Sequence, residues 1–181
     1  MENDQIENFY LSIGKFTVSF EHLFLGVKQK ITFLAGFNEE TKIILEAHSF
    51  RQAIDTLKKL IDWRTQDWNE DNKELKLFQK LVKDLNKINV ERNSVIHTTW
   101  FVGSDSNQKA NLELLGYKYS GGLNRRFKKL SINQINKLTS NSEVYYRILY
   151  TVWSIDGLSV TLPPLSKNWS IKNNEWFDNR K

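Results

Sequence analysis

Arg92, Asn93 and His97 lie within one short stretch of the chain and have the chemical character of an active site. Apolar residues recur every three or four positions before Arg92, so its guanidinium takes a position where a leucine or isoleucine is expected. Removal of a charge from water is unfavourable, so a partly buried charge is expected to have a counter-ion or a functional role. Arg92 is therefore either half of a structural salt bridge, with Glu21 or Glu91 as its counter-ion, or a permanent cation that binds a ligand.

The side chains of Asn93 and His97 share one face of a helix, because the two residues are four positions apart. The carboxamide can then hold the imidazole in one orientation, and an imidazole accepts and returns a proton near neutral pH. Arg92 lies about 140° around the same helix from His97, an angle that its side chain spans only in part. The two groups converge best where a groove or a second copy of the helix brings a substrate between them. A hydrogen-bonded histidine at a helix C-terminus is the alternative interpretation of His97.

Glu21 lies among apolar residues near the start of the chain and can meet Arg92 across a helical bundle as its counter-ion. His22 and His48 have no second ligand at a useful spacing, and we interpret both as structural. No pair of histidines four positions apart and no cluster of carboxylates marks a metal site. We therefore expect neither a metal nor another cofactor.

The densest basic segment of the chain combines cations with neighbouring aromatic residues. Its members are Arg125, Arg126, Lys128 and Lys129, with Phe127, Tyr117 and Tyr119 close in sequence. Single-stranded RNA favours such a mixture, because cations follow the phosphates while aromatic rings stack on the bases. The alternative is an exposed hairpin edge whose charge protects it from aggregation.

The composition bounds the class of protein. The length of 181 residues suits one domain with a hydrophobic core. The absence of cysteine excludes disulfides, thiolate zinc sites and cysteine nucleophiles, and no apolar run reaches the length of a signal peptide or a membrane span. We therefore expect a cytoplasmic protein that does not contact a membrane. The net charge of +5 favours contact with a polyanion such as RNA, although a solvated surface with surplus lysine explains it equally well.

Apolar residues at helical spacing predict three long helices in the first hundred residues. The first covers residues 6–37 and stops near Gly36, and the second covers residues 43–61 and packs nearly antiparallel on the first. The third covers residue 75 to about Trp100, where a segment rich in Gly, Ser and Asp ends it. The last turns of the third helix therefore carry the candidate catalytic residues.

Beyond the third helix, alternating patterns around a Gly-Gly turn predict a β-hairpin of residues 112–119 and 123–130. Capping-box spacing occurs at Ser131 and again at Ser140, with Gln and Glu three residues later. This predicts a short helix followed by a longer one, which ends near Gly157.

The fold class predicted from these elements is mainly all-α: an up-down bundle of four to five helices with a small β-hairpin insertion after the third helix. The tail carries Trp169, Trp176 and Phe177, so we expect it to pack on the bundle or on a partner. A single domain of residues 1–181 then has a core of about 6–158, a hairpin insertion of about 110–130 and an aromatic tail of about 159–181.

The stretch from Arg92 and Asn93 through Ser94, Val95 and Ile96 to His97 resembles the R-x4-6-H motif of HEPN domains, in which a polar residue often follows the arginine. The context is similar too, because the motif ends the third helix and an aromatic residue and further helices follow it. The resemblance covers about residues 6–158.

The resemblance implies metal-independent cleavage of RNA, in which the ribose 2′-hydroxyl attacks the adjacent phosphate and leaves a 2′,3′-cyclic phosphate and a 5′-hydroxyl. His97 would move the proton, Arg92 would bind the scissile phosphate and stabilise its growing charge, and Asn93 would orient His97 or contact the substrate. Proteins of this family usually pair across a twofold axis, so the resemblance also implies a homodimer with a composite active site.

The biological role implied by the resemblance is a toxin or antiphage defence effector, with an antitoxin or another regulatory partner. Two other functions stay open. One is a non-catalytic HEPN-like module that binds a nucleotide, RNA or a partner protein. The other is a helical interaction protein whose aromatic tail docks a partner, in which case the spacing of Arg92 and His97 is a coincidence.

Overall fold

The computed structural model describes residues 2–97, 99–102, 114–119, 125–151, 154–156, 159–161 and 165–180, with the side-chain surroundings of residues 6–97, 130–151 and 165–180. In this part of the chain the helices are α1 (Glu2–Leu34), α2 (Glu39–Glu46), α3 (Phe50–Arg64), α4 (Lys73–Ile96), α5 (Ile132–Thr151) and α6 (Leu165–Asn168). The strands are β1 (Thr99–Val102), β2 (Leu114–Tyr119), β3 (Arg125–Leu130), β4 (Ser154–Asp156), β5 (Ser159–Thr161), β6 (Trp169–Lys172) and β7 (Glu175–Asp178).

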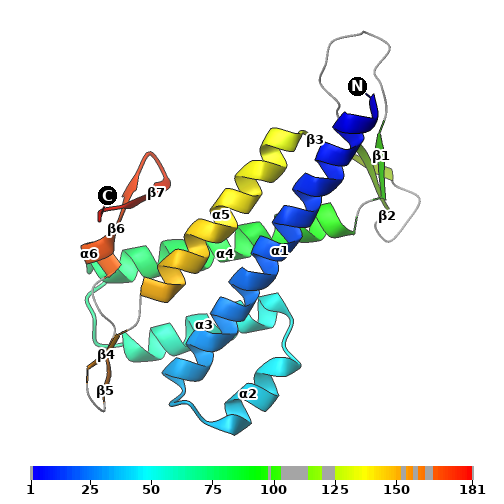
Figure 1. Cartoon of the computed structure of the whole chain (residues 1–181). Coiled ribbons are helices and arrows are strands. Elements are labelled where there is room, and N and C mark those ends of the chain that lie inside the picture. Colours follow the sequence, from blue (N-terminus) through cyan, green and yellow to red (C-terminus); the bar gives the residue numbers. More distant parts are fainter. Residues whose placement is uncertain are drawn as a thin grey trace.

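Four long helices form the body of the molecule, with α1 and α5 side by side across α4 (Figure 1). The apolar stripe of α1 is buried as its spacing predicts, and Phe16, Leu23 and Val27 are fully inaccessible to solvent. At Gly26 the helices approach closely, because a Cβ added there would lie 2.9 Å from the ring of Tyr146 on α5. The predicted first helix is confirmed, and Gly36, at φ +92, follows its end.

The prediction of one continuous second helix over residues 43–61 is wrong. The chain forms α2 and α3 instead, because Ser49 and Gln52 make a reciprocal capping box that starts a new helix. Ile43 is consequently 68% exposed rather than part of a buried stripe. The expected antiparallel packing on α1 is also wrong for α3: Phe50, its first residue, stacks edge-on against Phe20, and Arg64, its last, donates a hydrogen bond to the Leu34 carbonyl. The helices α1 and α3 therefore run parallel, and α2 belongs to the connection between them.

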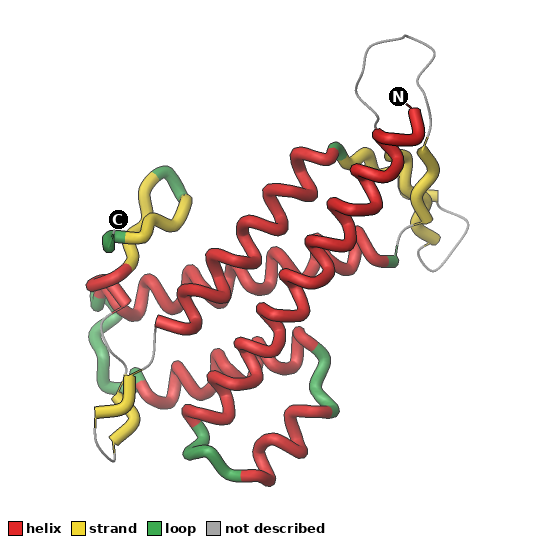
Figure 2. Tube along the Cα trace, in the orientation of Figure 1, coloured by secondary structure: helices red, strands yellow, loops and turns green. Residues whose placement is uncertain are grey.

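The third predicted helix ends earlier than expected. It is α4, which stops at Ile96 with His97 as its C-cap, so the extension to Trp100 is wrong. Residues 99–102 form β1, which pairs antiparallel with β2, and β2 pairs with β3. The predicted hairpin is confirmed as β2 and β3 and gains β1 as a third strand. Figure 2 shows this small sheet at the end of the bundle where α1 begins.

One helix, rather than the predicted two, follows the sheet. Ser131 and Gln134 form the predicted capping box at its start. Ser140 lies inside α5, because the buried residues Ile135 and Ile148 belong to one uninterrupted apolar stripe. The predicted end near Gly157 is wrong as well: α5 stops at Thr151, and residues 154–156 pair with residues 159–161 as β4 and β5.

The aromatic tail packs on the bundle, as predicted. Trp169 is 1% exposed, and its indole N–H donates to the Thr151 hydroxyl at 2.7 Å. β6 and β7 form a hairpin whose turn residues, Asn173 and Asn174, both have positive φ, as a tight type I′ turn requires.

The mainly all-α class with a small β insertion is confirmed. None of the described helices combines the length and the apolar character that a membrane span needs.

Candidate functional site

Arg92 lies on the side of α4 that faces α1, on the apolar stripe of the helix. Its guanidinium carbon is 5.3 Å from the centre of the Phe20 ring, which fits a cation–π contact. Its Nη2 atom is 3.6 Å from Oε1 of Glu21. The predicted ion pair with Glu21 is therefore confirmed, and the two side chains are 26% and 52% exposed.

The remaining donors of Arg92 are satisfied only in part. Nη1 donates a hydrogen bond of 3.3 Å to Oδ1 of Asn93. Nε is buried and has no hydrogen-bond partner among the described residues. A buried donor without a partner is unfavourable by about 1–3 kcal/mol, so the described residues alone do not satisfy this guanidinium. Such an arrangement is typical of a group kept for binding.

His97 is exposed at the very end of α4, where its backbone N–H donates to the Asn93 carbonyl at 3.1 Å. In the part of the chain that the structure describes, no hydrogen bond or ion pair fixes its imidazole. The Asn93 carboxamide, which we expected to orient His97, contacts Arg92 instead. The structure thus brings Glu21, Arg92 and Asn93 together and leaves the imidazole of His97 outside this cluster.

Beside this cluster, α4 exposes an apolar side chain, that of Val90. Val90 is 66% exposed, and Val90, Asn93 and His97 follow one another at steps of three and four residues along the helix. A substrate or a second chain that reached His97 along this face would therefore contact Val90 as well.

The basic segment belongs to the sheet at this end of the bundle. β1 begins two residues after His97, and β3, which contains Arg125, Arg126, Lys128 and Lys129, is the third strand of the same sheet. The side chains of these four residues lie outside the described part of the chain, so their predicted role in RNA binding stays a prediction. Strand order nevertheless connects them to the end of α4 that carries the motif.

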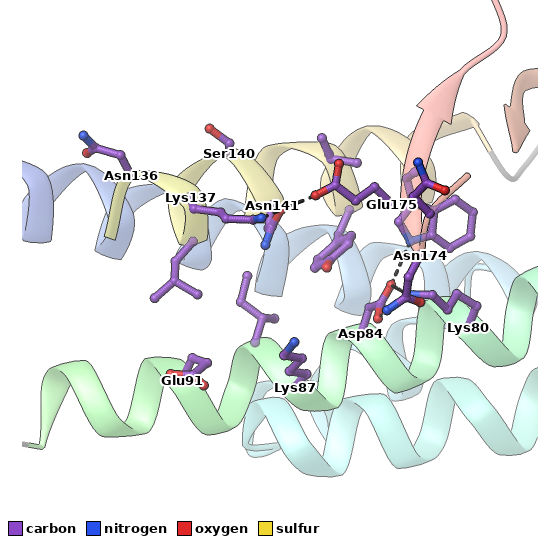
Figure 3. A pocket seen from close by; sticks show the side chains of 16 residues that line it. Lys80, Asp84, Lys87, Glu91, Asn136, Lys137, Ser140, Asn141, Asn174 and Glu175 are labelled. Carbon is purple, nitrogen blue, oxygen red and sulfur yellow. Dashed lines mark hydrogen bonds and ion pairs between the residues drawn. The ribbon is translucent and has the colours of Figure 1, made fainter. Parts of the chain in front are cut away.

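A second feature was not predicted from the sequence: a groove of about 650 Å³ between α4, α5 and the β6–β7 hairpin. Figure 3 shows Lys87 rising from α4 into this groove, while Lys137 and Asn141 face it from α5. Its floor includes Ile88 and Tyr145, which are 3% and 9% exposed. The groove depends on the tail hairpin, whose docking position sequence periodicity does not specify.

Asp84 anchors one end of this groove. Its carboxylate accepts hydrogen bonds from Lys80 at 2.5 and 2.7 Å and from the indole N–H of Trp176 at 2.8 Å. Burial, together with the charge of Asp84, raises the pKa of Tyr145 well above its usual value. Tyr145 thus stays a neutral phenol, and the hairpin is tied to α4 by a buried carboxylate.

His48 makes a local contact, whereas the structural interpretation of His22, which is exposed, stays a prediction. Nδ1 of His48 lies 2.8 Å from the Ile44 carbonyl oxygen, which fits the structural interpretation of this residue. No group of three or more His, Cys, Asp or Glu side chains suited to a metal ion occurs among the described residues.

Comparison with known protein families, with curated proteins and with solved structures finds no match to this chain.

Proposed function

We propose that the protein is a metal-independent endoribonuclease whose site is formed by Arg92 and His97, with Asn93 and Glu21 around the guanidinium. The observation that supports this proposal is the environment of the Arg92 guanidinium. The guanidinium takes a core-facing position, leaves Nε buried without a partner among the described residues, and has a half-exposed carboxylate, that of Glu21, as a counter-ion. A residue that served stability alone would have its donors satisfied or would be apolar.

The chemistry needs one phosphate ligand and two proton transfers. Arg92 binds the non-bridging oxygens of the scissile phosphate and stabilises the negative charge that develops on them. The 2′-oxygen forms a bond to phosphorus as a base removes its proton, and the bond to the 5′-oxygen breaks as that oxygen receives a proton. The imidazole of His97 suits either transfer, and its exposure at the end of α4 leaves it accessible to RNA.

A second copy of the chain would supply the second imidazole, so we propose a homodimer with a composite site. Two features support this. His97 is not held against Arg92 within one chain, and α1 exposes more than half of Leu11, Val18 and Leu25 at seven-residue spacing beside Glu21. Such a stripe suits helix–helix packing. A role as a toxin or antiphage effector under a regulatory partner is the biological setting that the HEPN resemblance suggests.

The decisive test uses labelled single-stranded RNA in excess EDTA. Wild-type protein is expected to cut it and leave 2′,3′-cyclic phosphate ends, while His97→Ala and Arg92→Ala lose at least about a hundredfold in rate. His48→Ala is the matched control, because it removes a partly exposed histidine that is not part of the cluster of Glu21, Arg92 and Asn93, and it is expected to cut at the wild-type rate. Intact RNA with the wild-type protein, or equal cutting by all variants, contradicts the proposal.

The groove between α4 and α5 favours one other function. Its volume lies in the range of ligand sites, and it combines an apolar floor with lysine and asparagine side chains. This supports the alternative of a non-catalytic module that binds a nucleotide or a partner. Binding of RNA without cleavage, unaffected by Arg92→Ala, is the result that would favour it.

A further inference from the structure

The carboxylate of Glu21 lies beside the Arg92 guanidinium, where a bound phosphate would also have to lie. Its carboxylate oxygen lies 3.6 Å from Nη2, longer than a strong charge-assisted hydrogen bond, and its side chain is 52% exposed. Because the carboxylate is half in water, it can turn aside when a phosphate approaches the guanidinium. Its backbone is fixed in the middle of α1, so its negative charge stays within a few ångströms of whatever Arg92 binds.

That remaining charge acts differently on different phosphates. An internal phosphodiester of RNA carries one negative charge, whereas a terminal phosphomonoester carries about two above pH 7. Repulsion from a fixed carboxylate grows with the charge of the ligand. A neighbouring glutamate therefore weakens binding of the monoester more than binding of the diester, while Arg92 attracts both.

We propose that Glu21 makes the Arg92 site selective for singly charged internal phosphodiesters over doubly charged terminal phosphates. The inference rests on the proposed function, because it assumes that Arg92 binds phosphate. Its consequence is that the enzyme cuts within RNA chains and is poorly inhibited by mononucleotides and by phosphorylated RNA ends. Glu21 acts here through the charge of the site and takes no part in proton transfer.

The test measures charge selectivity separately from cleavage. In a His97→Ala background, which prevents cleavage, binding of a fluorescent RNA without terminal phosphates is competed with uridine 3′-phosphate or with the dinucleoside monophosphate UpU at pH 8. The readout is the ratio of the two inhibition constants. Glu21→Gln keeps the shape of the side chain, and the replaced carboxylate is half exposed and 3.6 Å from Nη2, so the variant is expected to fold.

Glu7→Gln is the matched control. It makes the same change of charge on the exposed part of the same helix, 14 residues and therefore roughly 21 Å from Glu21. Relative to the wild-type side chain, Glu21→Gln is expected to strengthen inhibition by uridine 3′-phosphate roughly three- to tenfold more than inhibition by UpU. Glu7→Gln is expected to leave the ratio of the two constants unchanged.

The outcomes separate the two proposals. An unchanged ratio in Glu21→Gln, or the same change in Glu7→Gln, overturns the role of Glu21 even if Arg92→Ala abolishes binding. RNA binding that does not depend on Arg92 overturns the proposed function, and the inference with it. Weaker binding of both competitors in Glu21→Gln would mean that Glu21 only positions the guanidinium, which also contradicts selectivity by charge.

Discussion

Replacement of Asp84 by alanine tests how strongly the tail is held to the bundle. Asp84 and Lys80 form an ion pair four residues apart on α4 with side chains only 9% and 16% exposed, and the same carboxylate accepts the indole N–H of Trp176. Asp84→Ala leaves the ammonium of Lys80 without its partner in a largely buried place. Breaking a buried pair from one side destabilises by about 3–5 kcal/mol. At roughly 2–4 °C per kcal/mol for a chain of this size, the melting temperature should fall by roughly 6–20 °C.

The chain contains its own control for this substitution. Lys58 and Asp62 also form a Lys–Asp pair four residues apart, but their side chains are 55% and 49% exposed. Asp62→Ala is expected to change stability by no more than about 0.5 kcal/mol, because water screens an exposed pair. Both variants have the same change of charge and helix propensity, so their difference measures burial of the pair together with loss of the Trp176 hydrogen bond.

The assay is urea unfolding at pH 7, followed by circular dichroism. A loss of stability below about 1 kcal/mol, or a loss equal to that of Asp62→Ala, would refute the reasoning that this pair is buried and structurally important.

Three further predictions concern caps, burial and the site. Ser131→Ala should destabilise by about 1 kcal/mol in thermal unfolding, because it removes the N-cap of α5, whereas Ser140→Ala inside that helix should be neutral or slightly stabilising. Burial lowers the pKa of Lys30 to about 8, so the folded state binds fewer protons than the unfolded state between about pH 8 and 10.5. Stability attributable to Lys30 should therefore rise across that window, and Lys30→Met should remove the rise in urea titrations at pH 7 and pH 10. Arg92→Met should raise the melting temperature while abolishing cleavage, since it replaces a guanidinium whose buried Nε has no partner among the described residues. A lower melting temperature would indicate a structural salt bridge.

The helices that follow from periodicity alone were predicted well. The stripes of α1 and α4 and the capping box at Ser131 are local signals, and the structure confirms each of them. Sequence reasoning also suggested the ion pair of Glu21 with Arg92, because Arg92 interrupts an apolar stripe and Glu21 lies among the apolar residues of a helix that packs in the same bundle.

The errors arise where a local cap competes with a long stripe. At Ser49 the cap prevails, because Leu45 rather than Ile43 reaches the core and the stripe across residues 43–61 is not continuous in space. At Ser140 the stripe prevails, because burial of Ile135 and Ile148 in the core outweighs a cap. A capping box stabilises by about 1 kcal/mol, whereas one fully buried aliphatic side chain contributes about 1.5–3 kcal/mol, so the deciding quantity is tertiary burial.

The same reasoning explains why the sequence pointed to the cluster around Arg92 and missed the groove. A cation on an apolar stripe is visible in sequence as a departure from periodicity. In the structure, Arg92 accordingly has a buried Nε without a hydrogen-bond partner in the described part of the chain. The groove joins residues of α4 and α5 to a turn at Asn173 and Asn174, and its existence depends on where Trp176 meets Asp84. That contact spans 92 positions of the chain. A site that contains a residue of unexpected type in a periodic pattern can be found from the sequence. A site formed by segments far apart in the chain can be found only when the fold is known.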